Sequence, residues 1–152
     1  MAAALRDRGV RASTVRLPPS VHGAGDHGFV PILIDMARRT GRSAHVAGGN
    51  AWSAVHVVDA GRAFALALED GAALPVYHAA AEARVPFGVG LDLPVVEIPP
   101  EDAPAQFDWF AGFATLDAPA DATLTRARLG WSPDGLGLIE DIRTAGYFDA
   151  PT

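Results

Sequence analysis

The chain has 152 residues, of which 49% are hydrophobic and 20% charged, and its formal net charge at pH 7 is −6. This length suits one domain and the apolar share suffices for a packed core, while the lack of cysteine excludes disulfides, thiolate metal sites and a cysteine nucleophile. The acidic balance argues against a nucleic-acid partner, and no apolar run approaches the ~18–20 residues of a membrane span. With a charged amino terminus too short for a signal peptide, we expect a cytoplasmic protein.

The first predicted elements lead to a strand that ends at two prolines. Residues 2–8 predict the end of a helix, and residues 10–17, which are rich in β-branched side chains, predict a strand. Pro18 and Pro19 cannot donate to a β-ladder, so we expect strand pairing to stop there. The glycine-rich residues 20–28 then predict a loop.

The middle of the chain predicts two helices separated by two short strands. Residues 29–40 predict the clearest helix, because apolar residues recur at helical spacing on one face. Residues 44–47 and 53–58 predict short strands. Asp59 is predicted to cap a helix over residues 60–69, which has almost no polar face and should be well buried.

The rest of the chain predicts two more strands and three more helices. These are the strands 74–80 and 94–98 and the helices 101–113, 123–129 and 136–145. Residues 81–93 predict no regular element, because Gly88 and Gly90 oppose one. The order of strands and helices indicates an α/β fold.

Three short blocks occur in the order expected of one known family. They are Arg-Leu-Pro-Pro-Ser-Val-His-Gly at 16–23, Ala-Val-His-Val-Val-Asp-Ala at 54–60 and Leu-Gly-Trp-Ser-Pro at 129–133. In this order the blocks resemble the carboxyl-terminal half of an extended short-chain dehydrogenase/reductase, in the NAD(P)-dependent epimerase/dehydratase group. The resemblance covers nearly the whole chain.

The resemblance implies a partial Rossmann-like parallel sheet, made of the last strands, with a small carboxyl-terminal substrate-binding lobe. Residues 1–152 would form a single unit. Within it, residues 1–80 would belong to the Rossmann-like part, with interleaved lobe segments, and residues 81–152 would form the substrate-binding lobe.

Two features of the family are absent from this sequence. The glycine-rich phosphate loop has no counterpart, and the catalytic Tyr-x-x-x-Lys motif is missing because all 12 basic residues are arginine. The two tyrosines, Tyr77 and Tyr147, stand at late positions. We therefore assign no catalytic residue to this chain and expect it to be inactive alone.

The resemblance implies a cofactor-binding segment at the end of the strand over residues 10–17. There the backbone of Pro18, Pro19, Ser20 and Val21 would line the nicotinamide of NAD or NADP. Because the anchoring site for the pyrophosphate is absent, binding by this chain alone is expected to be weak.

The resemblance also implies four substrate-binding residues, His22, Asn50, Trp52 and His56. Trp52 has a ring that can stack on a sugar or another planar group, although packing in the core explains it equally well. His22 and the nearby His27 do not have the spacing or the companion ligands of a metal site, so we predict no metal.

The leading hypothesis is the carboxyl-terminal portion of an NAD(P)-dependent oxidoreductase that acts on a hydroxyl-bearing small molecule, a nucleotide sugar being one candidate. The alternatives are a non-catalytic ligand-binding or interaction module, a truncated remnant, and a reading frame with a misplaced start. If the other half is missing, the strand over residues 10–17 has an exposed edge through which the chain is expected to self-associate.

Overall fold

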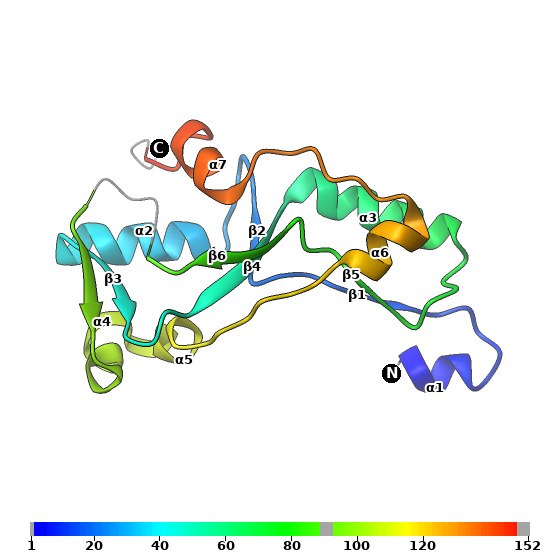
Figure 1. Cartoon of the computed structure of the whole chain (residues 1–152), viewed down its shortest axis with the longest axis horizontal. Coiled ribbons are helices and arrows are strands. Elements are labelled where there is room, and N and C mark those ends of the chain that lie inside the picture. Colours follow the sequence, from blue (N-terminus) through cyan, green and yellow to red (C-terminus); the bar gives the residue numbers. More distant parts are fainter. Residues whose placement is uncertain (1, 89–92, 149–152) are drawn as a thin grey trace.

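The computed structural model describes residues 2–88 and 93–148. Its strands are Thr14–Arg16 (β1), Ser20–His22 (β2), Ser43–Val46 (β3), Ala51–His56 (β4), Val76–His78 (β5), Glu82–Pro86 (β6) and Val95–Ile98 (β7). Its helices are Ala2–Arg6 (α1), Phe29–Thr40 (α2), Val57–Glu69 (α3), Ala103–Phe107 (α4), Ala111–Ala114 (α5), Thr123–Leu129 (α6) and Leu138–Thr144 (α7), with 3-10 turns at Pro100–Asp102 (η1) and Asp108–Phe110 (η2). Three small sheets follow one another along an elongated molecule (Figure 1), and the α/β fold is confirmed.

The first sheet is the parallel pair of β1 and β5, in which Val15 lies opposite Tyr77. Pairing with β5 stops before the prolines, as the sequence predicts. Within the described chain β1 pairs with β5 alone, so its other edge has no neighbouring strand.

The predicted loop over residues 20–28 is partly wrong, because Ser20–His22 forms the strand β2. This strand runs parallel to β4, with Val21 opposite Val55. Pro18 and Pro19 end one ladder, but the amides that follow them remain free to enter another. The two prolines therefore mark the point where the chain passes from the first sheet to the second.

The helix α2 has the predicted bounds and ends at Gly41, which adopts a left-handed conformation with φ of 69°. Val30, Ile34 and Ala37 are buried on its inner face. The helix packs against β3 and α4, which places it over the third sheet.

The junction between β4 and α3 differs from the prediction. The strand ends at His56 and the helix starts at Val57, so the N-cap is His56, whose Nδ1 accepts from the amide of Val58 at 3.3 Å. The predicted cap, Asp59, lies inside the first helical turn and is buried. Its carboxylate is engaged by a distant loop instead, which no local pattern signals.

The helix α3 is buried on one side only. Ala60, Ala63 and Ala67 are buried, but Phe64 and Leu68 are 43% and 80% exposed. The prediction of a well-buried helix is thus wrong for its outer face, because no described residue covers that face.

Residues 82–86 form the strand β6, although the sequence predicts no regular element there. This strand runs antiparallel to β4, with Val85 opposite Trp52. The two glycines that oppose a strand, Gly88 and Gly90, come after it, and residues 89–92 lie outside the described residues. Strand β7 has nearly its predicted bounds and pairs with β3.

The predicted helix over residues 101–113 is divided into short turns. Asp108 has a positive φ of 50°, which interrupts the helix between α4 and η2. With this break, Phe107 and Phe110 are both buried in the same apolar cluster. The helices α6 and α7 lie within their predicted ranges.

Buried side chains form three clusters that join distant parts of the chain. In the second cluster, Val55 and Ala60 pack with Ala122 and Trp131. The predicted division at residue 80 stays a prediction, since residues on both sides of it share each cluster. No helix in the described residues combines the length and apolarity needed to cross a membrane.

Candidate functional site

The predicted cofactor-binding segment lies between the first and second sheets. Pro18 and Ser20 are buried, while Pro19 and Val21 are half-buried. Ser20 lines a cavity, and its hydroxyl makes no hydrogen bond within residues 2–88 and 93–148. A free hydroxyl that faces a cavity can donate to a ligand or accept from it.

His22, at the end of β2, is held by the last helix. Its Nδ1 lies 2.7 Å from Oδ2 of Asp141 in α7, and both side chains are buried. Its Nε2 is buried and has no partner among the described residues. The ring meets that of His56 edge-on, with centroids 5.6 Å apart.

Two glycines let loops close over the histidine pair. A Cβ at Gly135 would lie 2.7 Å from Cβ of His56 and 2.7 Å from Oδ2 of Asp59. A Cβ at Gly23, whose φ is 144°, would lie 2.8 Å from the side chain of Val57. Neither position has room for a larger residue, which fixes the backbone close to the start of α3.

Asp59 connects the second and third blocks of the family resemblance. Its Oδ2 accepts from the amide of Gly135 at 2.8 Å, and its backbone carbonyl accepts from Nε1 of Trp131 at 3.0 Å. Arg62 donates to Asp59 at 3.1 Å and also to Asp134. Hydrogen bonding to Asp134, with a smaller contribution from Asp59, raises the pKa of Arg62 above its ordinary value.

Two carboxylates occupy the helix starts next to these loops. Glu82, in β6, accepts from the amide of Leu138 at the start of α7 at 2.7 Å. Asp26 accepts from the amide of Gly28, just before α2, at 2.6 Å. Carboxylates at such positions satisfy free amides and stabilise the helix dipole.

Tyr147 fastens the loop that follows β2. Its hydroxyl accepts from the amide of Gly23 at 3.0 Å and lies 3.0 Å from Oδ2 of Asp26. Burial, reinforced by the hydrogen bond to Asp26, raises the pKa of Tyr147 well above its ordinary value of 10. The phenol is therefore held in its protonated form and acts here as a structural hydrogen-bonding group.

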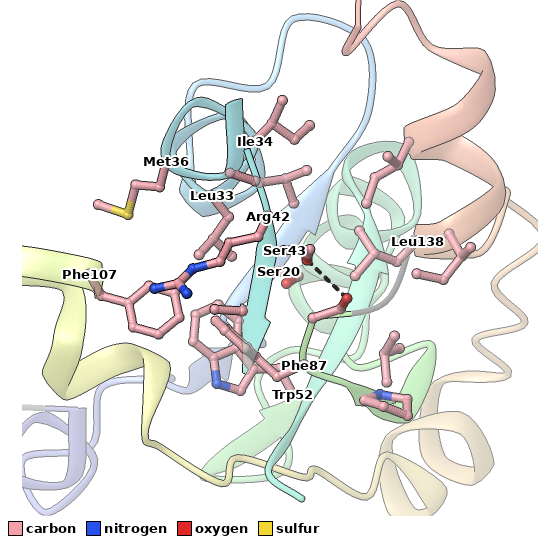
Figure 2. Close-up of a pocket in the computed structure, with 18 of the residues that line it drawn as sticks. Ser20, Leu33, Ile34, Met36, Arg42, Ser43, Trp52, Phe87, Phe107 and Leu138 are labelled. Atoms are coloured by element: carbon pink, nitrogen blue, oxygen red, sulfur yellow. Dashed lines mark hydrogen bonds between the residues drawn. The ribbon is translucent and has the colours of Figure 1, made fainter. Parts of the chain in front are cut away.

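A cavity of about 80 Å³ lies between α2, β3, β6, α4 and α7 (Figure 2). Ser20 and Trp52 both line it, so the structure brings together one predicted cofactor residue and one predicted substrate residue. At its edge, Nε and one terminal nitrogen of Arg42 donate to Oε1 of Gln106 at 3.0 and 2.8 Å. Ser43 donates to the carbonyl of Gly88 at 3.0 Å.

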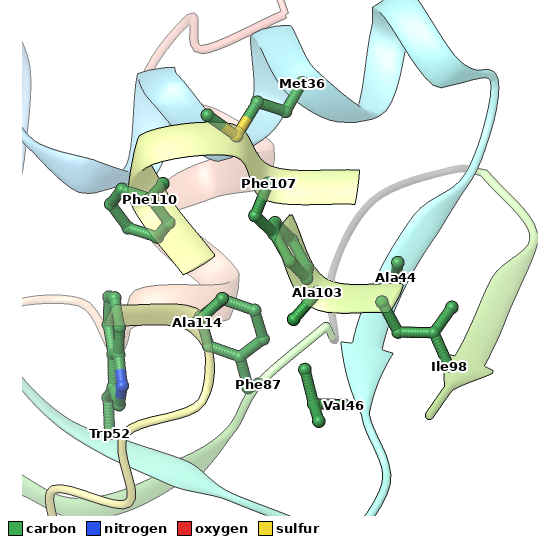
Figure 3. Close-up of a cluster of buried hydrophobic side chains, with 10 residues drawn as sticks. All are labelled: Met36, Ala44, Val46, Trp52, Phe87, Ile98, Ala103, Phe107, Phe110 and Ala114. Carbon is green, nitrogen blue, oxygen red and sulfur yellow. The ribbon is translucent and has the colours of Figure 1, made fainter. Parts of the chain in front are cut away.

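Trp52 is packed into the largest apolar cluster (Figure 3). Its ring centroid lies 5.0 Å from that of Phe87 and 5.6 Å from that of Phe29. Its Nε1 donates to the carbonyl of Leu116 at 2.9 Å. The ring is therefore part of the core and also lines the cavity.

Asn50 is separate from these features. Its Nδ2 donates to the carbonyls of Ala114 and Leu116, at 2.8 and 3.1 Å, and it is not among the residues that line the cavity. The four predicted substrate residues therefore divide into Trp52 at the cavity, His22 with His56 beside α3, and Asn50 at a loop. Their binding roles stay predictions.

Sequence reasoning missed several residues of this region. Asp141 gave no signal, since it lies 119 positions from His22 on a helix with other acidic residues. The spacing of Gly135 and Gly137 was a usable signal, because both face carboxylates at close range. No group of three His, Asp or Glu side chains among the described residues is placed to hold a metal ion.

The residues present fit one end of a nicotinamide dinucleotide. A carboxamide carries both donors and an acceptor, and the free Ser20 hydroxyl can pair with either kind of group. Pro18 and Pro19 have carbonyls but no amide hydrogen, so they can only accept. The pyrophosphate would need a glycine-rich loop, which the sequence does not contain.

Two yeast proteins are similar to this chain in sequence. The uncharacterized protein C2A9.02 of Schizosaccharomyces pombe is 45% identical over 149 residues, covering 93% of this chain and 50% of that protein. The uncharacterized protein YLL056C of Saccharomyces cerevisiae is 45% identical over 151 residues, covering 94% of this chain and 51% of that protein. The chain spans about half the length of the relatives it matches. No protein-family model matches it.

Solved structures identify the fold. The dTDP-glucose 4,6-dehydratase of Streptomyces venezuelae, solved with NAD bound, matches with a TM-score of 0.66 and 19% identity over 97% of this chain and 46% of that one. The ADP-L-glycero-D-manno-heptose-6-epimerase of Helicobacter pylori matches with a TM-score of 0.66 and 14% identity, over 99% of this chain and 49% of that one. The UDP-glucose-4-epimerase of Stenotrophomonas maltophila, also solved with NAD bound, matches with a TM-score of 0.63 and 17% identity, over 94% of this chain and 49% of that one.

The fold is therefore that of about half of a sugar-nucleotide epimerase or dehydratase. This confirms, at the level of the fold, the resemblance to the NAD-dependent epimerase/dehydratase family predicted from the three sequence blocks. The half-length match agrees with a carboxyl-terminal half.

Proposed function

We propose that the chain is the carboxyl-terminal, substrate-side portion of an NAD(P)-dependent oxidoreductase of the epimerase/dehydratase type, acting on a hydroxyl-bearing small molecule. One observation carries the proposal: Ser20, which is predicted to contact the cofactor, lies in the wall of the cavity. A cofactor lying along Pro18–Pro19 would therefore face the same space as a substrate. NAD or NADP, when bound, supplies hydride-transfer chemistry at a hydroxyl-bearing carbon.

The chain's own residues would bind and orient. The Ser20 hydroxyl offers a hydrogen bond at the boundary between the cofactor segment and the cavity. The contact of His22 with Asp141 holds the end of β2 against α7, so that this segment keeps its position. Tyr147 fixes the loop that follows through Gly23. None of these groups replaces the missing Tyr and Lys pair, so proton transfer needs residues from the other half.

A chimera tests this proposal directly. This chain would replace the matching half of the S. pombe relative, and calorimetry would measure NADH and NADPH binding to the chimera and to the chain alone. We expect binding to the chimera, a several-fold weaker affinity for its Ser20→Val variant, and no measurable binding to the chain alone. Tight binding to the chain alone, or a folded chimera that binds neither dinucleotide, contradicts the proposal.

A second candidate, a non-catalytic interaction module, is favoured by the outer face of α3. Val57, Phe64 and Leu68 lie on one helical face at spacings of seven and four residues, and all three are exposed. The helix packs against β1, whose outer edge is open within the described chain. A strand edge next to an apolar helix face suits pairing with a second copy of the chain.

Light scattering with hydrogen exchange tests the second candidate. The chain should form dimers in which the β1 amides are protected, and the double variant Phe64→Glu, Leu68→Glu should be monomeric. Leu124→Glu, at an exposed leucine of α6, is the matched control and should still dimerise. A monomeric parent chain rejects this candidate, and aggregation with little protection supports a remnant.

A further inference from the structure

The cavity beside Ser20 has an apolar wall. Three elements and the residue after β6 contribute apolar side chains to it, namely Val30 and Ile34 of α2, Val85 of β6, Phe87, and Leu138 and Ile142 of α7. Apolar walls favour ligands that lose little hydration on entry. A sugar ring carries a hydroxyl on most of its carbons and would find few free partners here, because Arg42 and Ser43 already donate to other groups.

The cavity also lacks a free cationic partner for a diphosphate. Arg42 is the one basic side chain among the described residues that line it. Two of its nitrogens donate to Oε1 of Gln106, and Nε2 of Gln106 donates in turn to Thr40 at 3.2 Å. Bidentate binding of a phosphate would require this network to break.

A carboxylate lies at the start of each of two helices beside the cavity. A helix N-terminus is an anion-binding site when its amides are free. At α2 the amide of Gly28 is bonded to Asp26, and at α7 the amide of Leu138, which lines the cavity, is bonded to Glu82. A diphosphate placed at either start would therefore lie close to a carboxylate of like charge.

The size of the cavity limits how much of a ligand it can hold. Its volume is about 80 Å³, whereas an engineered apolar cavity of ~150 Å³ accommodates benzene. The cavity is partly open to solvent, and the space inside it suits an alkyl group of roughly three or four carbons. Ser20 supplies a polar contact at this wall that no described residue uses.

From these contacts we infer that the substrate is a small, uncharged, largely apolar alcohol or carbonyl compound rather than a nucleotide sugar. Its alkyl part occupies the cavity between α2 and α7, and its oxygen is bonded by the hydroxyl of Ser20. The inference rests on the proposed function for the identity of the reacting group. It separates this chain from its structural neighbours, whose names refer to nucleotide-linked sugars.

The test compares two probes by NMR titration of the isotope-labelled chain. 3-Methylbutan-2-one represents the small apolar carbonyl compound, and UDP-glucose represents the nucleotide sugar. We expect saturable shifts of the Ser20, Val85 and Leu138 amides with the ketone in the millimolar range, as its few atoms allow, and none with UDP-glucose. Saturation by UDP-glucose, or no saturable shift with the ketone, overturns the inference.

Two variants locate the binding. Ser20→Ala removes the hydroxyl and should weaken ketone binding by roughly three- to tenfold, the value of one hydrogen bond. Ile139→Phe adds volume at the cavity wall and should abolish binding, while Leu124→Phe on exposed α6 is the matched control and should bind normally. Equal affinity in all three variants contradicts the assigned site. Amide dispersion of each variant, compared with the parent, shows that it is folded.

The outcomes distinguish this inference from the proposed function. Ketone binding in the cavity together with a folded chimera that binds no dinucleotide would reject the oxidoreductase and keep the cavity's ligand class. Dinucleotide binding by the chimera together with UDP-glucose binding in the cavity would keep the oxidoreductase and reject the ligand class.

Discussion

The two ends of the molecule are closed to different degrees. At the end of the molecule that holds the cavity (the cavity end), α2 packs against β3 and α4. Buried aromatic side chains, including Trp52 and Phe110, form one cluster there. At the opposite end, around the sheet of β1 and β5 (the sheet end), β1 has one neighbouring strand among the described residues. There α3 exposes an apolar outer face to solvent. The cavity end therefore contains its own packing partners, whereas the sheet end has apolar surface that a partner would cover.

This difference agrees with half of a larger fold. Solved neighbours are about twice as long, and the proposed missing half would carry the phosphate loop and the catalytic residues. In that case this chain would contain the whole proposed substrate cavity but only the segment Pro18–Val21 of the proposed cofactor site. On this view, stability is concentrated at the cavity end.

The largest effect is expected from truncating an aromatic residue at the cavity end. Phe110 is fully buried and contacts the rings of Phe29 and Trp52, so Phe110→Ala should lower the free energy of unfolding by ~3–5 kcal/mol. At the sheet end, Leu68→Ala should change it by less than ~0.5 kcal/mol, because the side chain is exposed. Urea denaturation measures both, and equal losses would show that α3 is covered in solution.

The next largest loss of stability is expected from breaking the hydrogen bond between His22 of β2 and Asp141 of α7. Asp141→Ala leaves the buried Nδ1 of His22 without its partner and should cost ~2 kcal/mol, whereas Glu140→Ala, its exposed neighbour on α7, should be nearly neutral. Chemical denaturation of the two variants provides the comparison. A neutral Asp141→Ala would mean that the last helix does not hold β2 in place.

Adding a methyl group at two glycines is expected to change the stability of the fold in opposite directions. Gly135 lies in a loop against the start of α3, and Gly61 lies within that helix. Gly135→Ala brings a Cβ within 2.7 Å of Asp59 and His56 and should destabilise the fold by ~1–3 kcal/mol. Gly61→Ala, in the middle of the helix, meets nothing within 4 Å and should stabilise by ~0.5–1 kcal/mol. Thermal unfolding compares the two variants. If both lower the melting temperature, the outer face of α3 is not free.

Local patterns account for the parts of the fold that the sequence predicted. The helix α2 has regular apolar spacing and a terminal glycine, and both signals lie within the element itself. The strand β2 was missed because its pairing depends on β4, more than thirty residues away. The interruption at Asp108 was missed for a similar reason, since only the core requires both Phe107 and Phe110 to be buried.

The candidate site was predictable only in part. The first block contains Ser20, and the family resemblance implied Trp52, so two of the residues that line the cavity were named from the sequence. The contact of His22 with Asp141 joins residues 119 positions apart, and no single-sequence pattern reports such a pairing. The role of Asp59 was misread because its side chain has two uses, capping a helix and binding a loop, and only tertiary structure decides between them.

The smallest effect concerns the pH dependence of the sheet end. Asp70, after α3, accepts from Arg128 at 2.7 Å and from the hydroxyl of Tyr77 at 2.6 Å. Arg128, followed by Tyr77, lowers the pKa of Asp70 below its ordinary value of 3.8. Burial, followed by the bond to Asp70, raises the pKa of Tyr77 above its ordinary value of 10.

These two shifts predict opposite limits of stability. A lowered carboxyl pKa stabilises the fold above pH 3.8, and this contribution is lost as the pH falls through the folded-state pKa. The raised pKa of Tyr77 stabilises the fold below pH 10, and this contribution is lost as the pH rises through the folded-state pKa. Asp70→Asn keeps the shape but not the charge, so its melting temperature should fall less steeply on the acid side than that of the parent. Parallel acid-side curves for the two proteins would show that Asp70 does not link α3 to α6 in solution.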